Sequence, residues 1–363
     1  MTAFAETAPY RAAFDAQGRA AEPRWLADSR RVALARFEAL GFPTRRSEDW
    51  RFTNLGPLRR ASFAPAAQDA TASPDLAHWL YPEQTHRLVL IDGRLAPTLC
   101  DIGPLPRGVH LASAEKTLTE RPDLAKALLD ETDREGGQAF ASLNAALFAD
   151  GFVLALEPGI HLERPVEIVH VGRAPRRSSQ LRSLVRLGEG ARATVIESFA
   201  GGAEHWLNGV VRIELEPGAA LRHAQLQDEE RSSIHFTQAR AVLAKDARYE
   251  AFVLNLGGGL ARHDILVRFA GEGAACGLFG ASLLRGEQEA TVATVVDHAA
   301  PGCATREYFK TVADERAHGV FLGRIAVRPD AQKTDAHQLN KNLLLSPRAN
   351  VDTKPELEIF ADE

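Results

Sequence analysis

The chain repeats a short motif after residue 187, where it reads L-G-E-G-A-R-A-T-V-I (residues 187–196) and then L-E-P-G-A-A-L-R-H-A (residues 215–224). Each copy has an apolar residue, a turn with glycine or aspartate, a small residue that is usually alanine, and a run typical of a β-strand. The two further copies are L-A-K-D-A-R-Y-E-A-F (243–252) and F-A-G-E-G-A-A-C-G-L-F (269–279).

The turn residues of this motif recur at a nearly constant distance. They are Gly190, Gly218, Asp246 and Gly273, which gives spacings of 28, 28 and 27 residues, and an earlier turn at Gly159 precedes the first by 31. A period of this length indicates stacked units of two or three strands, none of which can bury its apolar face alone.

The period predicts a mainly β fold built as a parallel β-helix, or β-solenoid. A β-sandwich fits less well, because its turns recur about every 8 to 12 residues without a fixed long period. The alanine after each turn is expected to let one coil stack closely on the next. The last coil of such a stack presents an unpaired sheet edge, which must be capped or occupied by a partner.

The sequence before the repeat has a different texture. Apolar residues recur at helical spacing from Trp25 to Leu40, and long helical periodicity disappears after Gly151. We therefore predict an N-terminal, mainly helical domain over residues 1–150 and a β-helix core domain over residues 151–363.

Two local stretches carry further expectations. The block over residues 43–55 is dense in charge and aromatic residues, and we expect it to dock Trp50 and Phe52 on a neighbouring surface. Near the other end, residues 351–360 read as an extended segment that Pro355 breaks.

Composition excludes several classes of protein. The three cysteines, Cys100, Cys276 and Cys303, form no C-x-x-C pair, which rules out a disulfide-stapled scaffold, a zinc ribbon and a self-sufficient four-cysteine iron–sulfur site. A formal net charge of −5 argues against nucleic acid as a partner. The N-terminus carries Glu6 and no apolar signal-peptide region, and no uncharged stretch has the roughly 20 apolar residues of a membrane span. We expect a cytoplasmic protein without a membrane partner.

Standard catalytic motifs are absent. There is no Gly-Lys dipeptide, hence no Walker A loop, and no H-E-x-x-H, H-x-H or G-x-S-x-G motif, so no catalytic residue is predicted. The best metal-binding candidates are His298 and Cys303, with His318 and His337 further along, because Cys and His suit zinc or iron. Their spacing matches no closed metal site, so structural roles are the favoured alternative. Cys276 lies among small apolar residues and is expected to be a buried, inert thiol.

Several blocks of the sequence resemble the SufB/SufD family of iron–sulfur cluster assembly proteins. The blocks cover nearly the whole chain, and E-D-W-R-F-T within the first of them favours the SufD branch over the SufB branch. They are P-T-R-R-S-E-D-W-R-F-T-N-L (43–55), L-N-A-A-L-F-A-D-G (143–151), H-A-A-P-G-C-A-T-R-E-Y-F-K (298–310), H-G-V-F-L-G-R-I (318–325), Q-K-T-D-A-H-Q-L-N-K-N-L-L-L-S (332–346) and D-T-K-P-E-L-E-I-F-A-D (352–362).

The resemblance implies a right-handed parallel β-helix flanked by helical domains, and a non-catalytic scaffold role. Members of the SufD branch pair with a SufB paralogue through the β-helix ends and bind the SufC ATPase through a C-terminal helical domain. It further implies a link to iron supply, with no tightly bound cofactor but transient iron or a nascent cluster shared with the partner. An open solenoid end is a natural place for strand-to-strand pairing.

The chain departs from the family at its last residue. In the family, the E-L-E-I-F-A-D block continues into V-K-C-S-H-G, whose histidine lies near the SufB–SufD interface, and then into the helices for SufC. This sequence stops at Glu363. We expect the C-terminal helical domain to be absent from this chain, with SufC binding only where that domain is present.

Two other classes of function remain as alternatives. One is a β-helix enzyme of the exported type that acts on polysaccharides, although the sequence has neither a signal peptide nor a carboxylate cluster. The other is a mononuclear metal-binding protein that uses His298 and Cys303. A homodimer in place of the SufB pairing is also open.

Overall fold

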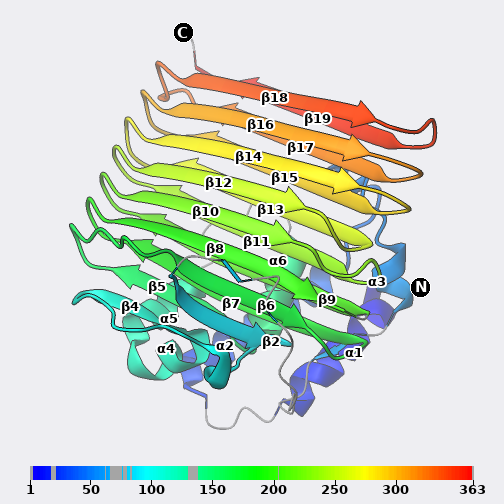
Figure 1. Cartoon of the computed structure of the whole chain (residues 1–363), viewed down its shortest axis with the longest axis horizontal. Helices are drawn as coiled ribbons and strands as arrows, with labels where there is room; N and C mark the ends of the chain where they lie inside the picture. The colour runs from blue at the N-terminus through cyan, green and yellow to red at the C-terminus, as the bar shows by residue number, and fades with distance from the viewer. Residues whose placement is uncertain are drawn as a thin grey trace.

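The computed structural model is a β-solenoid made of two facing, mainly parallel sheets, with helices packed behind it (Figure 1). The described residues are 3–17, 22–61, 63–65, 76, 80–81, 84–129, 138–202 and 204–361. We name the two sheets after the numbers of their solenoid strands.

The even sheet contains nine strands in the order β18-β16-β14-β12-β10-β8-β6-β2-β3. Their bounds are β2 His86–Ile91, β3 Arg94–Leu95, β6 Val166–Gly172, β8 Arg192–Gly201, β10 Ala220–Gln227, β12 Arg248–Asn255, β14 Ala275–Leu284, β16 Ala304–Ala313 and β18 Asp335–Leu344.

The odd sheet runs in the order β19-β17-β15-β13-β11-β9-β7-β5-β4, and the short β1 also pairs with β7. Their bounds are β1 Ala64–Pro65, β4 Val109–Ser113, β5 Phe152–Leu156, β7 Arg177–Leu187, β9 His205–Leu215, β11 Ile234–Leu243, β13 Leu260–Phe269, β15 Glu289–His298, β17 His318–Val327 and β19 Asn350–Ile359.

The sequence period is one coil of the solenoid. Ala220 of β10 lies beside Arg192 of β8 on one side and beside Arg248 of β12 on the other, so pairing partners are one period apart. The predicted turn residues have positive φ angles, which glycine adopts without strain and aspartate tolerates. These angles are 66° at Gly190, 69° at Gly218, 57° at Asp246 and 70° at Gly273.

The alanines after these turns have the role that the sequence predicts. Ala191, Ala219, Ala247 and Ala274 are fully buried. The backbone N–H of Ala220 donates to the carbonyl of Ala191 in the coil below, at 2.9 Å. A larger side chain in this row would push adjacent coils apart, so the prediction of a β-solenoid is confirmed together with its stacking residue.

The N-terminal region is mainly helical but also supplies strands to the solenoid. Its β2, β3 and β4 lie at the ends of the two sheets, next to the first coils. The predicted helix from Trp25 to Leu40 is α2. The helices are α1 Ala3–Ala16, α2 Arg24–Leu40, α3 Gly56–Arg60, α4 Ala114–Glu120, α5 Pro122–Leu128 and α6 Gln138–Leu147, with short 3₁₀ turns η1 Glu48–Trp50 and η2 Pro97–Leu99.

The helices join the odd sheet through an aromatic cluster on its outer face. Trp50 is buried there, 5.0 Å from the ring of Phe140 and beneath the guanidinium of Arg262, which lies 3.9 Å from the indole ring. Trp206 and Phe236 extend the cluster onto β9 and β11. The docking expected of Trp50 is therefore present, whereas Phe52 is half-buried and does not belong to this cluster.

The expected break at Pro355 does not occur, because β19 continues through this residue to Ile359. Pro355 pairs with Gly323 of β17 in the register of the sheet. Within the described residues β19 is the last strand of the odd sheet and one of its edges has no neighbouring strand. A proline, which has no N–H, is tolerated at such an edge.

Candidate functional site

The structure separates the metal-binding candidates. His298 ends β15, whereas His318 begins β17 and pairs with Glu289 at the opposite end of β15. Ten-residue strands are roughly 30 Å long, so these two histidines lie far apart. His337 projects from β18 into solvent, 3.1 Å from Asp335.

The side chains of His298 and Cys303 have structural partners. His298 Nε2 lies 2.8 Å from the Thr305 hydroxyl, and the Cys303 thiol donates to the Gly271 carbonyl at 3.4 Å. Burial lowers the pKa of His298 to about 4, so its imidazole is neutral at pH 7. Across the residues that the structure describes, no three Asp, Glu, His or Cys side chains are arranged to hold a metal ion.

Cys276 points into the solenoid from β14, where its thiol lies 3.6 Å from the Thr305 hydroxyl. Burial raises the pKa of this thiol to about 12 and also raises the pKa of Cys303 above its usual value. Both thiols are therefore protonated and shielded at neutral pH.

We expect Cys276 to react with iodoacetamide at pH 8 at least about a hundredfold more slowly in the native protein than in denaturant, because the thiolate is the reactive form. Mass spectrometry of the labelled peptides gives the rate at each cysteine. Equal native and denatured rates would contradict the buried placement.

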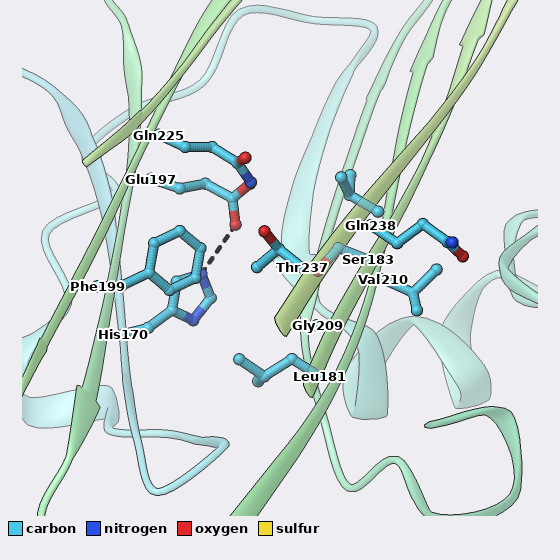
Figure 2. Close-up of a pocket in the computed structure, with 11 residues that line it drawn as sticks. His170, Leu181, Ser183, Glu197, Phe199, Gly209, Val210, Gln225, Thr237 and Gln238 are labelled. Carbon is cyan, nitrogen blue, oxygen red and sulfur yellow. Dashed lines mark hydrogen bonds and ion pairs between the residues drawn. The ribbon is translucent and has the colours of Figure 1, made fainter. Parts of the chain in front are cut away.

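The sequence analysis missed a charged network inside the solenoid. Glu197 of β8 is buried between two histidines: His170 Nε2 donates to Oε2 at 2.9 Å, and His223 Nε2 donates to Oε1 at 2.8 Å (Figure 2 shows the His170 contact). Gln225 donates to the same Oε1 at 3.2 Å. On the far side of His223, Nδ1 lies 3.1 Å from the Tyr249 hydroxyl, which donates to it when the histidine is neutral.

These contacts fix the charge of Glu197. Burial by itself raises the pKa of the carboxyl, but hydrogen bonds from His170 and His223 and the positive charge that these rings can carry outweigh it, so the pKa lies well below the usual range. An ionised carboxylate only accepts hydrogen bonds, so both histidines must donate to it. A small cavity beside His170 and Glu197 has room for about one water molecule (Figure 2).

A second buried carboxylate lies in the turn before β11. Glu229 Oε2 accepts from Gln227 at 2.9 Å and lies 2.8 Å from His235 Nδ1. The ring of His235 is 4.7 Å from that of His263, whose Nδ1 lies 2.8 Å from the Thr237 hydroxyl. Burial lowers the pKa of His263 well below its usual value, which keeps this imidazole neutral.

Polar residues continue from these networks to the last coil. The inward-facing position of Gln227 is occupied in successive even strands by Asn255, Ser282, Thr311 and Asn342. Such a row is unusual for a solenoid core, where inward positions are normally apolar. It makes one row of inward positions polar from the middle coils to the end of the stack.

Glu307 faces the interior from β16, one coil below the last and four residues before Thr311. Its Oε2 accepts from Gln338 at 2.6 Å and from Thr294 at 3.1 Å. Its Oε1 is buried without a hydrogen-bond partner in the described structure. Burial raises the pKa of the carboxyl to about 7, although both hydrogen bonds act in the other direction.

The last coil has its inner face uncovered by any described residue. Leu357 of β19 occupies the same inward position as Ile325 of β17, yet it is 61% exposed whereas Ile325 is 3% exposed. Most of the large apolar side chains that are exposed in the described chain belong to this coil. They are Leu339, Leu343, Leu344, Leu345, Leu357, Ile359 and Phe360.

These features define a class of protein: a two-sheet β-solenoid whose mainly apolar interior contains buried polar networks, and whose last described coil is uncovered. The chain belongs to the SufBD family of iron–sulfur cluster assembly proteins. The family model described as "SUF system FeS cluster assembly, SufBD core domain" matches residues 170–363, and the model of the SufBD N-terminal region matches residues 15–168.

Curated relatives agree with this family. A SufBD family protein for iron–sulfur cluster assembly from Synechocystis is 30% identical over 352 residues, which cover 93% of this chain and 77% of the relative. The iron–sulfur cluster assembly protein SufD of Escherichia coli is 29% identical over 335 residues, 89% of this chain and 75% of that protein. The chloroplastic protein ABCI7 of Arabidopsis thaliana is 29% identical over 335 residues, 89% of this chain and 70% of that protein.

None of the helices in the described ranges combines the length and the apolar character that crossing a bilayer requires.

Proposed function

We propose that this protein is a non-catalytic scaffold subunit of the SUF system, which pairs with a SufB-like paralogue through the open end of its solenoid. The uncovered last coil carries this proposal. Three of its inward-facing side chains, Leu344, Leu357 and Ile359, are apolar and exposed, and the outer edges of β18 and β19 have no strand beside them in the described structure. Unpaired edges with an apolar face favour the addition of strands from another chain.

The ligand chemistry of the chain supports a shared cluster. Its three cysteines are too few for a four-thiolate cluster, and the described part of the chain contains no ready metal site. We propose that iron and the nascent cluster are transient cargo, held at the interface with ligands that the partner supplies, and that this chain is linked to iron supply.

Our proposal for a SufC-like partner rests on the resemblance to the SufB/SufD family. We propose that a SufC-like ATPase binds through helices that follow the solenoid in family members, rather than through the solenoid. Nucleic acid and membranes are not proposed as partners, and three free thiols suit a reducing cytoplasm.

The carboxyl groups along the surface groove give little support to the alternative function of a polysaccharide-cleaving enzyme. Retaining and inverting glycosidases typically use two carboxyl groups on either side of the scissile bond. Among the described residues that line the groove on the outer face of the even sheet, Glu250 is the one carboxylate.

Replacing Leu357 with lysine tests the pairing. Since Leu357 is exposed, Leu357→Lys is expected to leave the melting temperature nearly unchanged while it weakens binding to a purified SufB-like paralogue at least about tenfold, because a charge enters a desolvated interface. Analytical ultracentrifugation measures both the heterodimer affinity and any homodimer. Val32→Lys is the matched control, because Val32 is 70% exposed on α2, away from the last coil.

The same variants can test cluster building. Anaerobic mixing of this protein, the paralogue, ferrous iron and sulfide is expected to produce cluster absorbance that neither Leu357→Lys nor this protein alone supports. Wild-type protein that ignores the paralogue, or Leu357→Lys that pairs as tightly as Val32→Lys, would overturn the proposal. A homodimer that Leu357→Lys dissociates, without binding of the paralogue, would assign the open end to self-pairing instead.

A further inference from the structure

An apolar row crosses the outer face of the even sheet. Successive strands place one apolar residue each in the same register position, facing away from the core. The row, which we call the even-sheet row, consists of Ile196, Ala224, Phe252, Phe279, Tyr308 and Leu339.

Among the residues that the structure describes, few cover the even-sheet row. Helices and Trp50 pack on β9, β11 and β13 of the odd sheet, and Leu80 and Leu99 pack over the outer face of β2 and β6 in the first coils. Beyond them Phe252 is 41% exposed and Leu339 is 46% exposed. In Figure 1 the even-numbered strands from β8 to β18 form the front layer, and the helices lie behind or below this layer.

A groove lies over the first part of this row. Ile196, Ala224 and Phe252 form its floor, and Tyr81 forms part of its wall. The groove is several times larger than a single water site and mostly apolar, so it can take side chains of another molecule.

Positive charge borders the even-sheet row. The outward-facing side chains of the even-numbered strands from β8 to β18 include six exposed cations but only two carboxylates, Glu250 and Asp335, although the whole chain has a net charge of −5. Asp335 pairs with Arg306. The cations are Arg192, Arg222, Arg248, Arg306, Lys310 and Lys341.

We propose that the even-sheet row is a second docking surface, which binds an amphipathic helix of a partner protein whose apolar face is bordered by Asp and Glu. Six strands about 4.8 Å apart give the row a length of about 24 Å, which equals about 16 residues of α-helix. The molecule already shows this geometry on the other side, where α6 packs on β7 and β9 of the odd sheet. A row one side chain wide matches one face of a helix, whereas a bilayer would meet a broader apolar surface.

This surface goes beyond the proposed pairing function, because it lies on the outside of the solenoid and uses side chains rather than the free strand edges. Binding to it can therefore be measured on the isolated protein, without the SufB-like paralogue. A failure to bind the helix at the even-sheet row would not contradict the proposed pairing with a SufB-like paralogue. A failure of that pairing would likewise not contradict helix binding at the row.

The test uses a fluorescein-labelled 16-residue helical peptide with leucine at helical spacing and glutamate on both borders, and a twin in which lysine replaces every glutamate. Fluorescence anisotropy is expected to show at least tenfold tighter binding of the acidic peptide at low salt, and weaker binding as salt rises. Phe252→Ser is expected to weaken binding about tenfold, because it removes an apolar anchor. Val32→Ser is the control for an exposed apolar residue elsewhere.

Charge reversal keeps the test independent of folding. The double variant Arg222→Glu and Arg248→Glu is expected to reverse the preference, so that the lysine peptide binds more tightly than the glutamate peptide. Equal binding of both peptides to the wild type, or binding that Phe252→Ser leaves unchanged, would overturn the proposal. Tighter binding of single-stranded DNA or of vesicles with 30% phosphatidylserine, lost in Phe252→Ser, would also overturn it and assign the surface to that ligand.

Discussion

Replacing Glu197 with glutamine is expected to lower the free energy of unfolding by about 3 to 5 kcal/mol at pH 7. This is the usual loss of stability when one charged partner of a buried network is removed. The carboxylate accepts from His170, His223 and Gln225 inside the solenoid. A glutamine amide has only one acceptor oxygen, and its NH₂ group would face an N–H donor. A buried donor without an acceptor adds to the loss.

Urea denaturation at several pH values measures this effect. The low pKa of Glu197 in the folded protein means that its stabilisation is complete above the ordinary glutamate pKa of 4.5 and declines as pH falls below that value. The difference between wild type and Glu197→Gln should therefore shrink by about 2 kcal/mol between pH 6 and pH 3. Glu250→Gln, on the outward face of β12, is the control, and a loss below about 1 kcal/mol for Glu197→Gln would contradict the network.

The coil architecture was predictable because its determinants are local and repeated. Three features recur together in each coil: a turn that needs a positive φ angle, an alanine at the close contact with the next coil, and a strand of alternating side chains. The distance between their recurrences gives the register of the sheet. The continuity of β19 through Pro355 was not predictable from the residue, because only the position of the strand at the sheet edge makes a missing N–H harmless.

The buried network was missed although the sequence contains a signal for it. Val195, Glu197 and Phe199 have the same parity in β8, so the two apolar neighbours place Glu197 on the inward face. The spacing of one coil then places Gln225 beside it. A charged residue on an inward position with a polar residue one period later is the pattern that predicts an interior network.

Closeness in the sequence did not predict which of the metal-binding candidates lie close together in space. His298 and His318 are 20 residues apart in the sequence, but a rigid coil carries them to opposite ends of adjacent strands. His298 instead meets Thr305, seven residues on, because the turn between β15 and β16 folds the chain back toward the interior. Two residues of a solenoid lie close in space when their numbers differ by one period of about 28 residues. The numbers of His298 and His318 do not differ by one period.

The second large effect is expected at Glu307, where glutamine should stabilise the protein by about 3 kcal/mol at pH 8 and change its stability little at pH 4.5. In the unfolded chain this carboxyl loses its proton near pH 4.5, whereas burial raises its folded pKa to about 7. The stability that the neutral carboxyl provides is therefore complete below pH 4.5 and is lost as pH rises through 7.

Glutamine keeps the neutral form at every pH and retains an acceptor oxygen for Gln338 and Thr294. Other groups also titrate in this range, such as Asp150, whose pKa burial raises to about 6, so the informative quantity is the difference between Glu307→Gln and wild type at each pH. Chemical denaturation from pH 4.5 to 8 should show this difference growing with pH. Because Gln338 belongs to β18, ionisation of Glu307 acts on the coil that forms the open end. A difference that stays flat across this range would mean that the carboxyl titrates near its ordinary pKa.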